Sequence, residues 1–390
     1  MPVSAAGMGR TLLLPGRKAE GGTMKKILMV FGTRPEAIKM CPLVLELKKR
    51  KGVQVVVCVT GQHREQLDQV LDVFGVVPDY DLNIMKERQT LFDITVNVMT
   101  GMDRVLFKEK PDAVLVHGDT TTAFSAMVSA FFHHIPIGHV EAGLRTYDME
   151  APFPEEFNRQ CIAVPAKWNF APTEWCRNNL MKEHRRPESI FVTGNTAIDA
   201  MKITVREDYK DRILDWAEGN RIIFLTAHRR ENIGEPMRRI LRAVRRIAEE
   251  HEDVRVVYPV HRNPEVQRVA YDELFWGDRI LMTPPMDVIA CHNIMARSYM
   301  ILTDSGGIQE EATCLGKPTL VLRDTTERPE GIEAGTLKLV GCCTEKICQE
   351  AGRLLDDERE YKRMACAGNP YGDGHASERI ADILLGKEEG

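Results

Sequence analysis

The stretch TDSGGIQEE at residues 303–311 decides the fold that the sequence predicts. It follows an apolar run at 299–302, which is typical of a buried strand, and leads into a helical stretch at 308–315. A strand, a turn of small residues and a helix, in that order, place free backbone N–H groups at a helix N-terminus, where an anion binds favourably. The residues that we expect to hold a phosphate are Ser305, Gly306 and Gly307.

Two glutamates, Glu310 and Glu311, lie a few residues into this predicted helix. Their carboxylates could accept hydrogen bonds from the hydroxyl groups of a sugar or a ribose. Taken alone, the stretch is equally compatible with a capped strand–helix turn whose two glutamates are solvated. The rest of the chain is therefore needed to choose between an anion site and a plain turn.

The same order of strand, turn and helix recurs along the chain from Met24 onward. Short apolar runs are followed by polar or glycine-containing turns and then by helical stretches, a pattern that indicates parallel sheets with helices on both faces. Ligands of such sheets bind at the carboxyl ends of the strands. The expected strands are residues 26–31, 53–60, 113–117 and 135–140, and then 221–227, 254–260, 279–282, 299–303 and 319–322.

The chain has 390 residues, which is too long for one typical domain. We expect an α/β protein with two doubly wound, Rossmann-like parallel-sheet domains that face each other across a cleft. The first domain is predicted at residues 24–193 and the second, which would hold the anion, at 194–372. Residues 373–386 are expected to cross back onto the first domain. Residues 1–23 are interpreted as a disordered leader, because their apolar run is too short for a signal peptide.

Composition excludes several classes of function. A net charge of -5 with both signs interspersed provides no basic surface for nucleic acid. Ten cysteines without a C-x-x-C pair argue against a zinc site and a disulfide scaffold, and they favour a reducing, cytoplasmic location. No apolar run is long enough for a membrane helix. Neither a G-x-G-x-x-G nor a P-loop motif occurs, so we expect no nicotinamide cofactor, no metal and no P-loop kinase.

Carboxylates at strand ends are the first candidates for chemistry. Asp119 follows a buried strand in HGDTTT, where its alternative role is to cap a helix that begins near Thr121. Glu141 ends a strand in HVEAGLRT, and its alternative role is to pair with Arg145. Glu155 follows PFP and occupies the first turn of a helix, a position that the helix dipole alone would favour.

His228 is the fourth candidate, in the segment TAHRREN. It ends a predicted strand beside Arg229 and Arg230, a setting that suits an anionic leaving group, although a lone histidine is often structural. The candidates together describe a cleft with a phosphate cradle on one side and carboxylates on the other. That combination suits a nucleotide-activated sugar.

Eleven segments, taken together, resemble the non-hydrolysing UDP-N-acetylglucosamine 2-epimerases. They occur in the same order and span the chain from Met24 to about Leu385. The segments are FGTRPEAIKM, TGQHREQLDQVL, HGDTTT, HVEAGLRT, PFPEEFNRQ, VTGNTAID, TAHRREN, VYPVH, DSGGIQEEA, GKPTLVLRDTTERPE and NPYGDG.

The resemblance implies a GT-B-like fold, a homodimer and interconversion of UDP-N-acetylglucosamine and UDP-N-acetylmannosamine without a cofactor. The catalytic residues that it implies are Asp119, Glu141, Glu155 and His228. The nucleotide contacts that it implies are Arg34, Ser305, Gly306, Gly307 and Glu311. Some members bind a second substrate molecule as an activator near the positions of Gln62 and His261, which are therefore the candidate allosteric positions. Glu65 stands where those members carry glutamine, so the sequence does not assign that regulation to this chain.

Four alternatives remain open from the sequence. A hydrolysing epimerase would release free N-acetylmannosamine, and a GT-B glycosyltransferase would share the nucleotide cradle but require an acceptor. A UDP-sugar sensor would bind without turnover. Related epimerases act on UDP-2,3-diacetamido uronic acids, so the substrate is the least secure part of the prediction.

Overall fold

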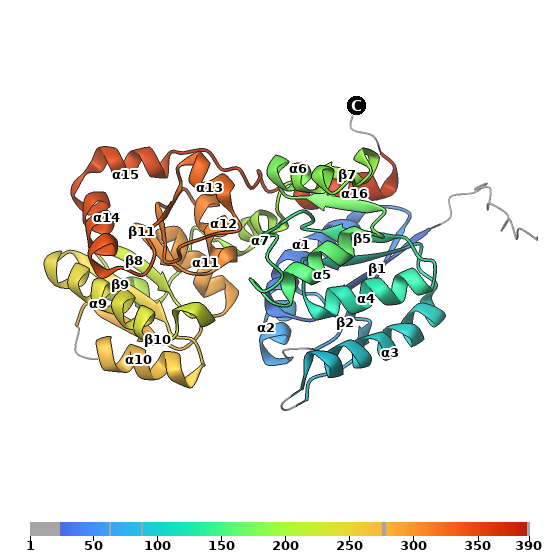
Figure 1. The fold of residues 1–390 in the computed structure, drawn as a ribbon, viewed down its shortest axis with the longest axis horizontal. Helices are drawn as coiled ribbons and strands as arrows, with labels where there is room; N and C mark the ends of the chain where they lie inside the picture. The colour runs from blue at the N-terminus through green and yellow to red at the C-terminus, as the bar shows by residue number, and fades with distance from the viewer. Residues whose placement is uncertain (1–23, 62–63, 87–88, 275–277, 388–390) are drawn as a thin grey trace, which may run out of the picture.

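The computed structural model describes residues 24–61, 64–86, 89–274 and 278–387. The expected leader at residues 1–23 lies outside this part of the chain. Two lobes lie side by side, each built around one parallel sheet (Figure 1). We call them the first and the second lobe in chain order. The prediction of an α/β fold with two doubly wound parallel sheets, in the GT-B-like arrangement, is confirmed.

The sheet of the first lobe has seven parallel strands in the order β3-β2-β1-β4-β5-β6-β7. Its central strands β1 and β4 are almost fully buried apolar runs, as expected for a parallel sheet covered by helices on both faces. The strands are β1 (Lys25–Phe31), β2 (Val53–Val59), β3 (Tyr80–Asp81), β4 (Ala113–His117), β5 (Ile137–Val140), β6 (Trp168–Ala171) and β7 (Ile190–Val192). The helices are α1 (Arg34–Lys49), α2 (Arg64–Phe74), α3 (Leu91–Glu109), α4 (Thr121–Phe132), α5 (Glu155–Ala163) and α6 (Glu174–Lys182), with the short 3-10 helix η1 (Pro187–Ser189).

The sheet of the second lobe has six parallel strands in the order β10-β9-β8-β11-β12-β13. Its strands are β8 (Arg221–Thr226), β9 (Val254–Pro259), β10 (Ile280–Thr283), β11 (Met300–Thr303), β12 (Thr319–Val321) and β13 (Leu337–Leu339). The helices from residue 196 onward are α7 (Thr196–Thr204), α8 (Arg212–Trp216), η2 (Arg230–Asn232), α9 (Glu235–Glu250), α10 (Pro264–Leu274), α11 (Val288–Arg297), α12 (Gly306–Cys314), α13 (Pro329–Ala334), α14 (Thr344–Asp356), α15 (Glu358–Ala365) and α16 (Ala376–Leu385).

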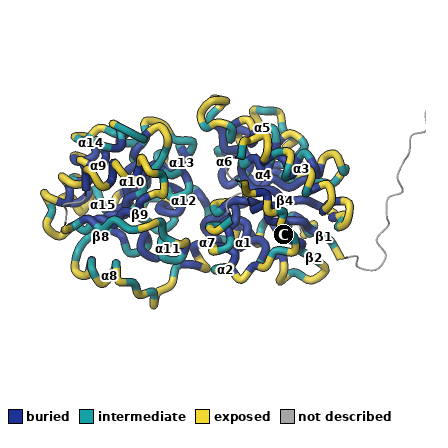
Figure 2. Tube along the Cα trace, turned by 90° about the horizontal axis from the view of Figure 1, so that it is seen from below, coloured by how far each residue is buried: buried dark blue, intermediate teal, exposed yellow. Residues whose placement is uncertain are grey.

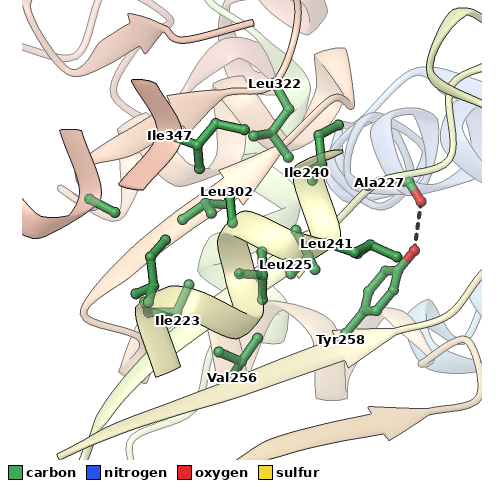
Figure 3. Close-up of a cluster of buried hydrophobic side chains, with 14 of the residues drawn as sticks. Ile223, Leu225, Ala227, Ile240, Leu241, Val256, Tyr258, Leu302, Leu322 and Ile347 are labelled. Atoms are coloured by element: carbon green, nitrogen blue, oxygen red, sulfur yellow. Dashed lines mark hydrogen bonds between the residues drawn. The ribbon is translucent and has the colours of Figure 1, made fainter. Parts of the chain in front are cut away.

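Each lobe has its own apolar core on the two faces of its sheet, and buried positions concentrate there (Figure 2). In the second lobe, β8 and β9 pack against α9, whose Ile240 and Leu241 point into the core while its arginines remain outside (Figure 3). The Tyr258 hydroxyl in this core donates a hydrogen bond of 2.9 Å to the Ala227 carbonyl. The basic run around α9 is therefore one face of an amphipathic helix.

The C-terminal helix α16 lies with the first lobe, although it follows the last elements of the second (Figure 1). Its Ile380 and Leu384 belong to the same apolar cluster as α1. The two chain crossings between the lobes touch each other, because the Asn195 N–H donates a hydrogen bond of 2.8 Å to the Tyr371 carbonyl. Both connections between the lobes therefore pass through one narrow point.

Strand and helix limits differ from expectation in places. Four short strands, β3, β6, β7 and β13, were absent from the predicted set; each has two to four residues, too few for a periodic signal. Helix α12 begins at Gly306 rather than near residue 308, and β5 begins at Ile137 rather than at 135. Among the described residues, no helix has the length and apolar character needed to cross a membrane.

Candidate active site

A cleft of about 680 Å³ lies between the carboxyl ends of the two sheets. Its lining includes the turns after β1, β4 and β5 in the first lobe and the N-terminus of α12 in the second. Most of the expected site residues border this cleft: Arg34, Asp119, Glu141, Glu155, His228, His261, Ser305, Gly307 and Glu311. The two lobes thus contribute different chemistry to one space.

Glu141 lies directly after β5 with a backbone φ of 65°, a left-handed conformation that is uncommon for a residue with a side chain. Its Oε1 forms an ion pair with Lys39 and accepts a hydrogen bond of 3.3 Å from Asn195 Nδ2. Its Oε2 faces His117 Nε2 at 3.7 Å. Burial acts to raise the pKa of Glu141, but the charge of Lys39 and its neighbours outweighs it and holds the pKa well below the ordinary value.

The expected alternative for Glu141, a pair with Arg145, is not found. Arg145 Nε instead contacts Glu183 Oε1 at 2.6 Å. The partner of Glu141 is Lys39 on α1, a residue that the sequence prediction missed. Lys39 is buried, yet it lines the cleft.

Lys39 also reaches the second lobe. Its Nζ lies 3.1 Å from Glu310 Oε2, and Glu310 Oε1 lies 2.8 Å from Arg328 Nε. Lys39, Glu310 and Arg328 are all buried. A line of alternating charges therefore runs from Glu141 across the junction of the lobes. Glu310 takes part in this line, so its carboxylate is not a solvated group of the kind considered in the sequence.

Asp119 lies in the turn between β4 and α4. Its Oδ2 is 2.7 Å from Arg159 Nη2, and its backbone carbonyl accepts a hydrogen bond of 2.8 Å from Asn158 Nδ2. The helix α4 is capped by Thr120 and not by Asp119, so the capping alternative is wrong. Burial raises the pKa of Asp119 above its ordinary value, against the pull of Arg159.

Glu155 is the first residue of α5 and borders the cleft, as expected. Its Oε2 is buried without a hydrogen-bond partner among the described residues. The next residue, Glu156, is fully buried and accepts hydrogen bonds from the backbone N–H groups of Thr146 and Tyr147 at 3.0 and 3.1 Å. Glu156 therefore secures the loop before α5, whereas the Glu155 carboxylate has capacity to receive a proton or a hydroxyl group.

His228 follows β8 and borders the cleft from the second lobe. Asp304, which is fully buried, accepts hydrogen bonds of 2.8 Å from the backbone N–H groups of His228 and Arg229. The His228 ring stacks on His261 with centroids 5.1 Å apart. Burial lowers the pKa of His228, so the ring is largely neutral at pH 7 and can donate from one nitrogen.

The N-terminus of α12 opens onto the cleft through Ser305 and Gly307. Ser305 is the N-cap residue, and its hydroxyl makes no capping hydrogen bond. A Cβ built on Gly307 would meet nothing within 4 Å, whereas one on Gly306 would lie 2.8 Å from the Arg328 Cζ. Gly306 is buried against Arg328, and the first-turn N–H groups of α12 remain available to an anion.

Arg34 and Glu311 complete the expected nucleotide contacts at the cleft. Arg34 is the first residue of α1, and its Nη2 donates a hydrogen bond of 2.8 Å to the Met286 carbonyl of the second lobe. Glu311 is buried, and its Oε2 lies 3.5 Å from His292 Nε2. The remaining expected site residue, Gln62, lies outside the described residues.

Several charged or titratable residues of the cleft were missed from the sequence, among them Lys39, His117, Arg159 and Arg328. Burial lowers the pKa of His117 to about 4, so this ring is neutral behind Glu141 at pH 7. The signal for Lys39 was present, because it is a single charge inside the apolar run AIKMCPLVL of α1. In the ranges that the structure describes, no group of three or more His, Cys, Asp or Glu side chains is arranged to hold a metal ion.

Comparison with known proteins places the chain among sugar-nucleotide enzymes. A family model described as UDP-N-acetylglucosamine 2-epimerase matches residues 45–385. A UDP-N-acetylglucosamine 2-epimerase of Bacillus subtilis is 58% identical over 360 residues, which cover 92% of this chain and 95% of that protein.

Solved structures agree. An S. aureus protein solved with UDP has a TM-score of 0.88 and 51% identity, covering 94% of this chain and 98% of its own. A UDP-GlcNAc 2-epimerase from Neisseria meningitidis bound to UDP-GlcNAc has a TM-score of 0.88 and 47% identity, covering 93% and 100%. The chain therefore belongs to the UDP-N-acetylglucosamine 2-epimerase family, the one that its sequence segments resemble.

Proposed function

We propose that this protein interconverts UDP-N-acetylglucosamine and UDP-N-acetylmannosamine by inverting C2 of the sugar. The observation that carries the proposal is the cleft, where carboxylates of the first lobe meet the open N-terminus of α12 in the second. Proton-transfer groups and a diphosphate site are the two parts that such a reaction requires. Membership of the family supports the same substrate.

The C2 proton of the sugar is not adjacent to a carbonyl, so its direct removal near neutral pH faces a prohibitive barrier. In the proposed reaction UDP leaves C1 with the electron pair of the C1–O bond, and the oxocarbenium character that develops acidifies C2–H. A carboxylate then takes that proton, and the C–H electrons form the C1=C2 bond of 2-acetamidoglucal. Addition of a proton to the other face of C2 and return of UDP to C1 complete the inversion.

Two of the three carboxylates Asp119, Glu141 and Glu155 are proposed to transfer protons, one on each face of C2, while the third orients a partner. The pairing with Lys39 holds the pKa of Glu141 below its ordinary value, whereas burial raises the pKa of Asp119 above its own. Environments that separate the pKa values of neighbouring carboxyl groups are typical of an acid and a base working together.

The proposed diphosphate site combines the first-turn N–H groups of α12 with Arg34 and His228. Backbone N–H groups, the charge of Arg34 and a hydrogen bond donated by the neutral His228 ring would stabilise the charge that develops on a leaving diphosphate. Glu311 is proposed to accept from the ribose hydroxyls, since its carboxylate borders the cleft one turn into α12. UDP would then remain bound to Ser305, Gly306 and Gly307 while the bond between the sugar and UDP breaks and forms again.

The organisation of the protein is part of the proposal. Residues 24–193 and 194–372 are proposed as two domains, with 373–386 returning to the first, and the location as cytoplasmic in support of cell-surface polysaccharide synthesis. Ten cysteines, all free, support a reducing compartment. A homodimer is proposed because five phenylalanines of the consecutive helices α3, α4 and α5 are exposed: Phe92, Phe107, Phe131, Phe132 and Phe157.

The test is incubation with UDP-N-acetylglucosamine in deuterated water, followed by NMR. The proposal predicts a UDP-linked manno product with deuterium at C2 of both epimers. Conversion without deuterium would contradict the elimination route. Free N-acetylmannosamine with UDP would indicate a hydrolysing enzyme, and binding without turnover would indicate a sensor or a different substrate. The same experiment with a UDP-2,3-diacetamido uronic acid distinguishes that last case.

A further inference from the structure

Lys39 contacts two carboxylates that belong to different lobes. On one side its Nζ pairs with Glu141 Oε1 in the first lobe, and on the other it lies 3.1 Å from Glu310 Oε2 in the second. The Lys39 side chain is 8% exposed, that of Glu141 9% and that of Glu310 1%, so all three groups are withdrawn from water. A buried lysine between two carboxylates is held by both and cannot reorient without breaking a pair.

We infer that Lys39 is a positioning residue for the epimerisation: it keeps the Glu141 carboxylate charged and orients it, and Glu310 of the second lobe holds Lys39 in place. This inference rests on the function proposed above. It assigns the two oxygens of Glu141 different tasks, because Oε1 is engaged by Lys39 and by Asn195 Nδ2. Oε2 has no hydrogen-bond partner among the described residues, with His117 Nε2 at 3.7 Å, and is left for proton transfer.

The groups that face Glu141 come from several elements. Lys39 comes from α1, His117 from the end of β4, Asp119 from the turn after β4, and Arg328 from the second lobe. Burial keeps the pKa of His117 near 4, so that ring carries no charge at neutral pH. The cations that act on Glu141 are therefore Lys39, in direct contact, and Arg328, which is engaged with Glu310.

The second lobe thereby helps to set the charge and the orientation of Glu141, a carboxylate of the first lobe. Asn195, which also contacts Glu141 Oε1, belongs to the chain crossing between the lobes, next to Tyr371. Both partners of Oε1 thus depend on the arrangement of the two lobes. A charged and oriented Glu141 is then a property of the assembled cleft and not of the first sheet alone.

The test compares the pH dependence of kcat for C2 deuterium incorporation in the wild type and in Lys39→Met. A base must be deprotonated, so the rate falls as the pH drops through its pKa. Without the lysine charge we expect this acid limb to move up by about 1–3 pH units, the usual effect of an opposite charge within contact distance. The affinity for UDP is expected to stay unchanged, and Lys39→Arg is expected to restore most of the wild-type profile.

The matched control is Glu109→Gln, which removes the carboxylate that pairs with Lys26 at 2.9 Å. Lys26 lies at the amino-terminal end of β1, and the cleft lies at the carboxyl ends of the strands. Its profile is expected to coincide with that of the wild type. An unmoved acid limb in Lys39→Met, or a parallel loss of UDP affinity, would overturn the inference and indicate a structural or substrate-binding role. Absence of deuterium incorporation in the wild type would contradict the proposed function instead.

A second measurement covers the case in which Lys39→Met does not fold. The Glu141 carboxyl carbon of the wild type, labelled with carbon-13 and assigned through Glu141→Gln, is titrated by NMR. The inference predicts titration below the ordinary range of glutamate, independently of any activity. Titration within that ordinary range would contradict it.

Discussion

At the scale of single residues, a catalytic role and a helix-capping role of Asp119 predict different effects of a substitution. The structure removes the capping alternative, because Thr120 and not Asp119 caps α4. The Asp119 side chain is held by Arg159 and borders the cleft. Its carboxylate is therefore not engaged in capping the helix and is available for the proposed proton transfer.

Asp119→Asn is expected to lower kcat by about 100-fold or more, the usual cost of removing a proton-transfer group. The amide keeps the shape of the side chain and an oxygen that accepts from Arg159, whose charge Glu156 at 3.6 Å still balances. The free energy of unfolding is therefore expected to remain close to that of the wild type. Steady-state kinetics and chemical denaturation check the two parts.

The control for this change is Asp357→Asn. Asp357 is the exposed N-cap of α15, far from the cleft, and asparagine caps a helix about as well as aspartate. Both activity and stability are expected to be unchanged. Similar losses of activity in the two variants would contradict the catalytic role of Asp119.

Residue pairs distant in the sequence were the ones that sequence reasoning missed. Lys39 and Glu141 are 102 positions apart, and Lys39 and Glu310 are 271 apart, so no local pattern connects them. Arg145, four positions from Glu141, was the partner expected from the local sequence, but Arg145 forms an ion pair with Glu183 instead. Sequence patterns thus identified many of the residues that border the cleft, but the partners that set their charge depend on the packing of α1 against both lobes.

At the scale of elements, the central strands could be predicted and the edge strands could not. β1 and β4 are buried on both faces and are therefore continuous apolar runs. β3 has two residues and β13 three, and their limits depend on the neighbouring strand with which they pair. Helix α12 was predicted in the right place, but its start was predicted two residues too late. Its first two residues are glycines, whose intrinsic helix propensity is poor.

The N-terminus of α12 gives a prediction in which stability and binding change in opposite directions. Gly307→Ala adds a methyl group that meets no atom of the protein within 4 Å. Replacing a helical glycine by alanine is expected to raise the free energy of unfolding by up to about 1 kcal/mol. The methyl group occupies the space proposed for the diphosphate, so the Kd for UDP is expected to rise about tenfold or more, which corresponds to about 1.4 kcal/mol.

Calorimetric titration with UDP and chemical denaturation measure the two effects. Gly352→Ala in α14 is the control, because a Cβ there meets its nearest atom at an ordinary 3.9 Å and the site is remote from the cleft. It is expected to raise stability without changing UDP binding. Unchanged UDP affinity in Gly307→Ala would show that the diphosphate binds elsewhere.

At the scale of the whole molecule, exposed aromatic side chains form the surface that the proposed homodimer would cover. Phe131 and Phe132 at the end of α4 are 57% and 65% exposed. Under the proposed homodimer, Phe132→Glu is expected to convert the dimer to a monomer, because a charge would be buried in the interface. Sedimentation velocity measures the mass in solution.

Val77→Glu provides the control for the dimer prediction. Val77 is 76% exposed and belongs to the loop after α2, not to α3, α4 or α5. This variant is expected to keep the mass of the wild type. A wild-type protein that sediments as a monomer, or a Phe132→Glu variant that remains a dimer, would contradict the assignment of this surface.

The central claim for the whole molecule is that one sugar nucleotide spans the cleft, with its diphosphate on the second lobe and its C2 beside the carboxylates of the first. The most direct measurement is a crystal structure of Asp119→Asn with UDP-N-acetylglucosamine bound. The account predicts the diphosphate at the backbone N–H groups that begin α12 and C2 of the sugar next to Glu141 Oε2. A diphosphate bound away from α12, or a sugar directed away from Glu141, would contradict it.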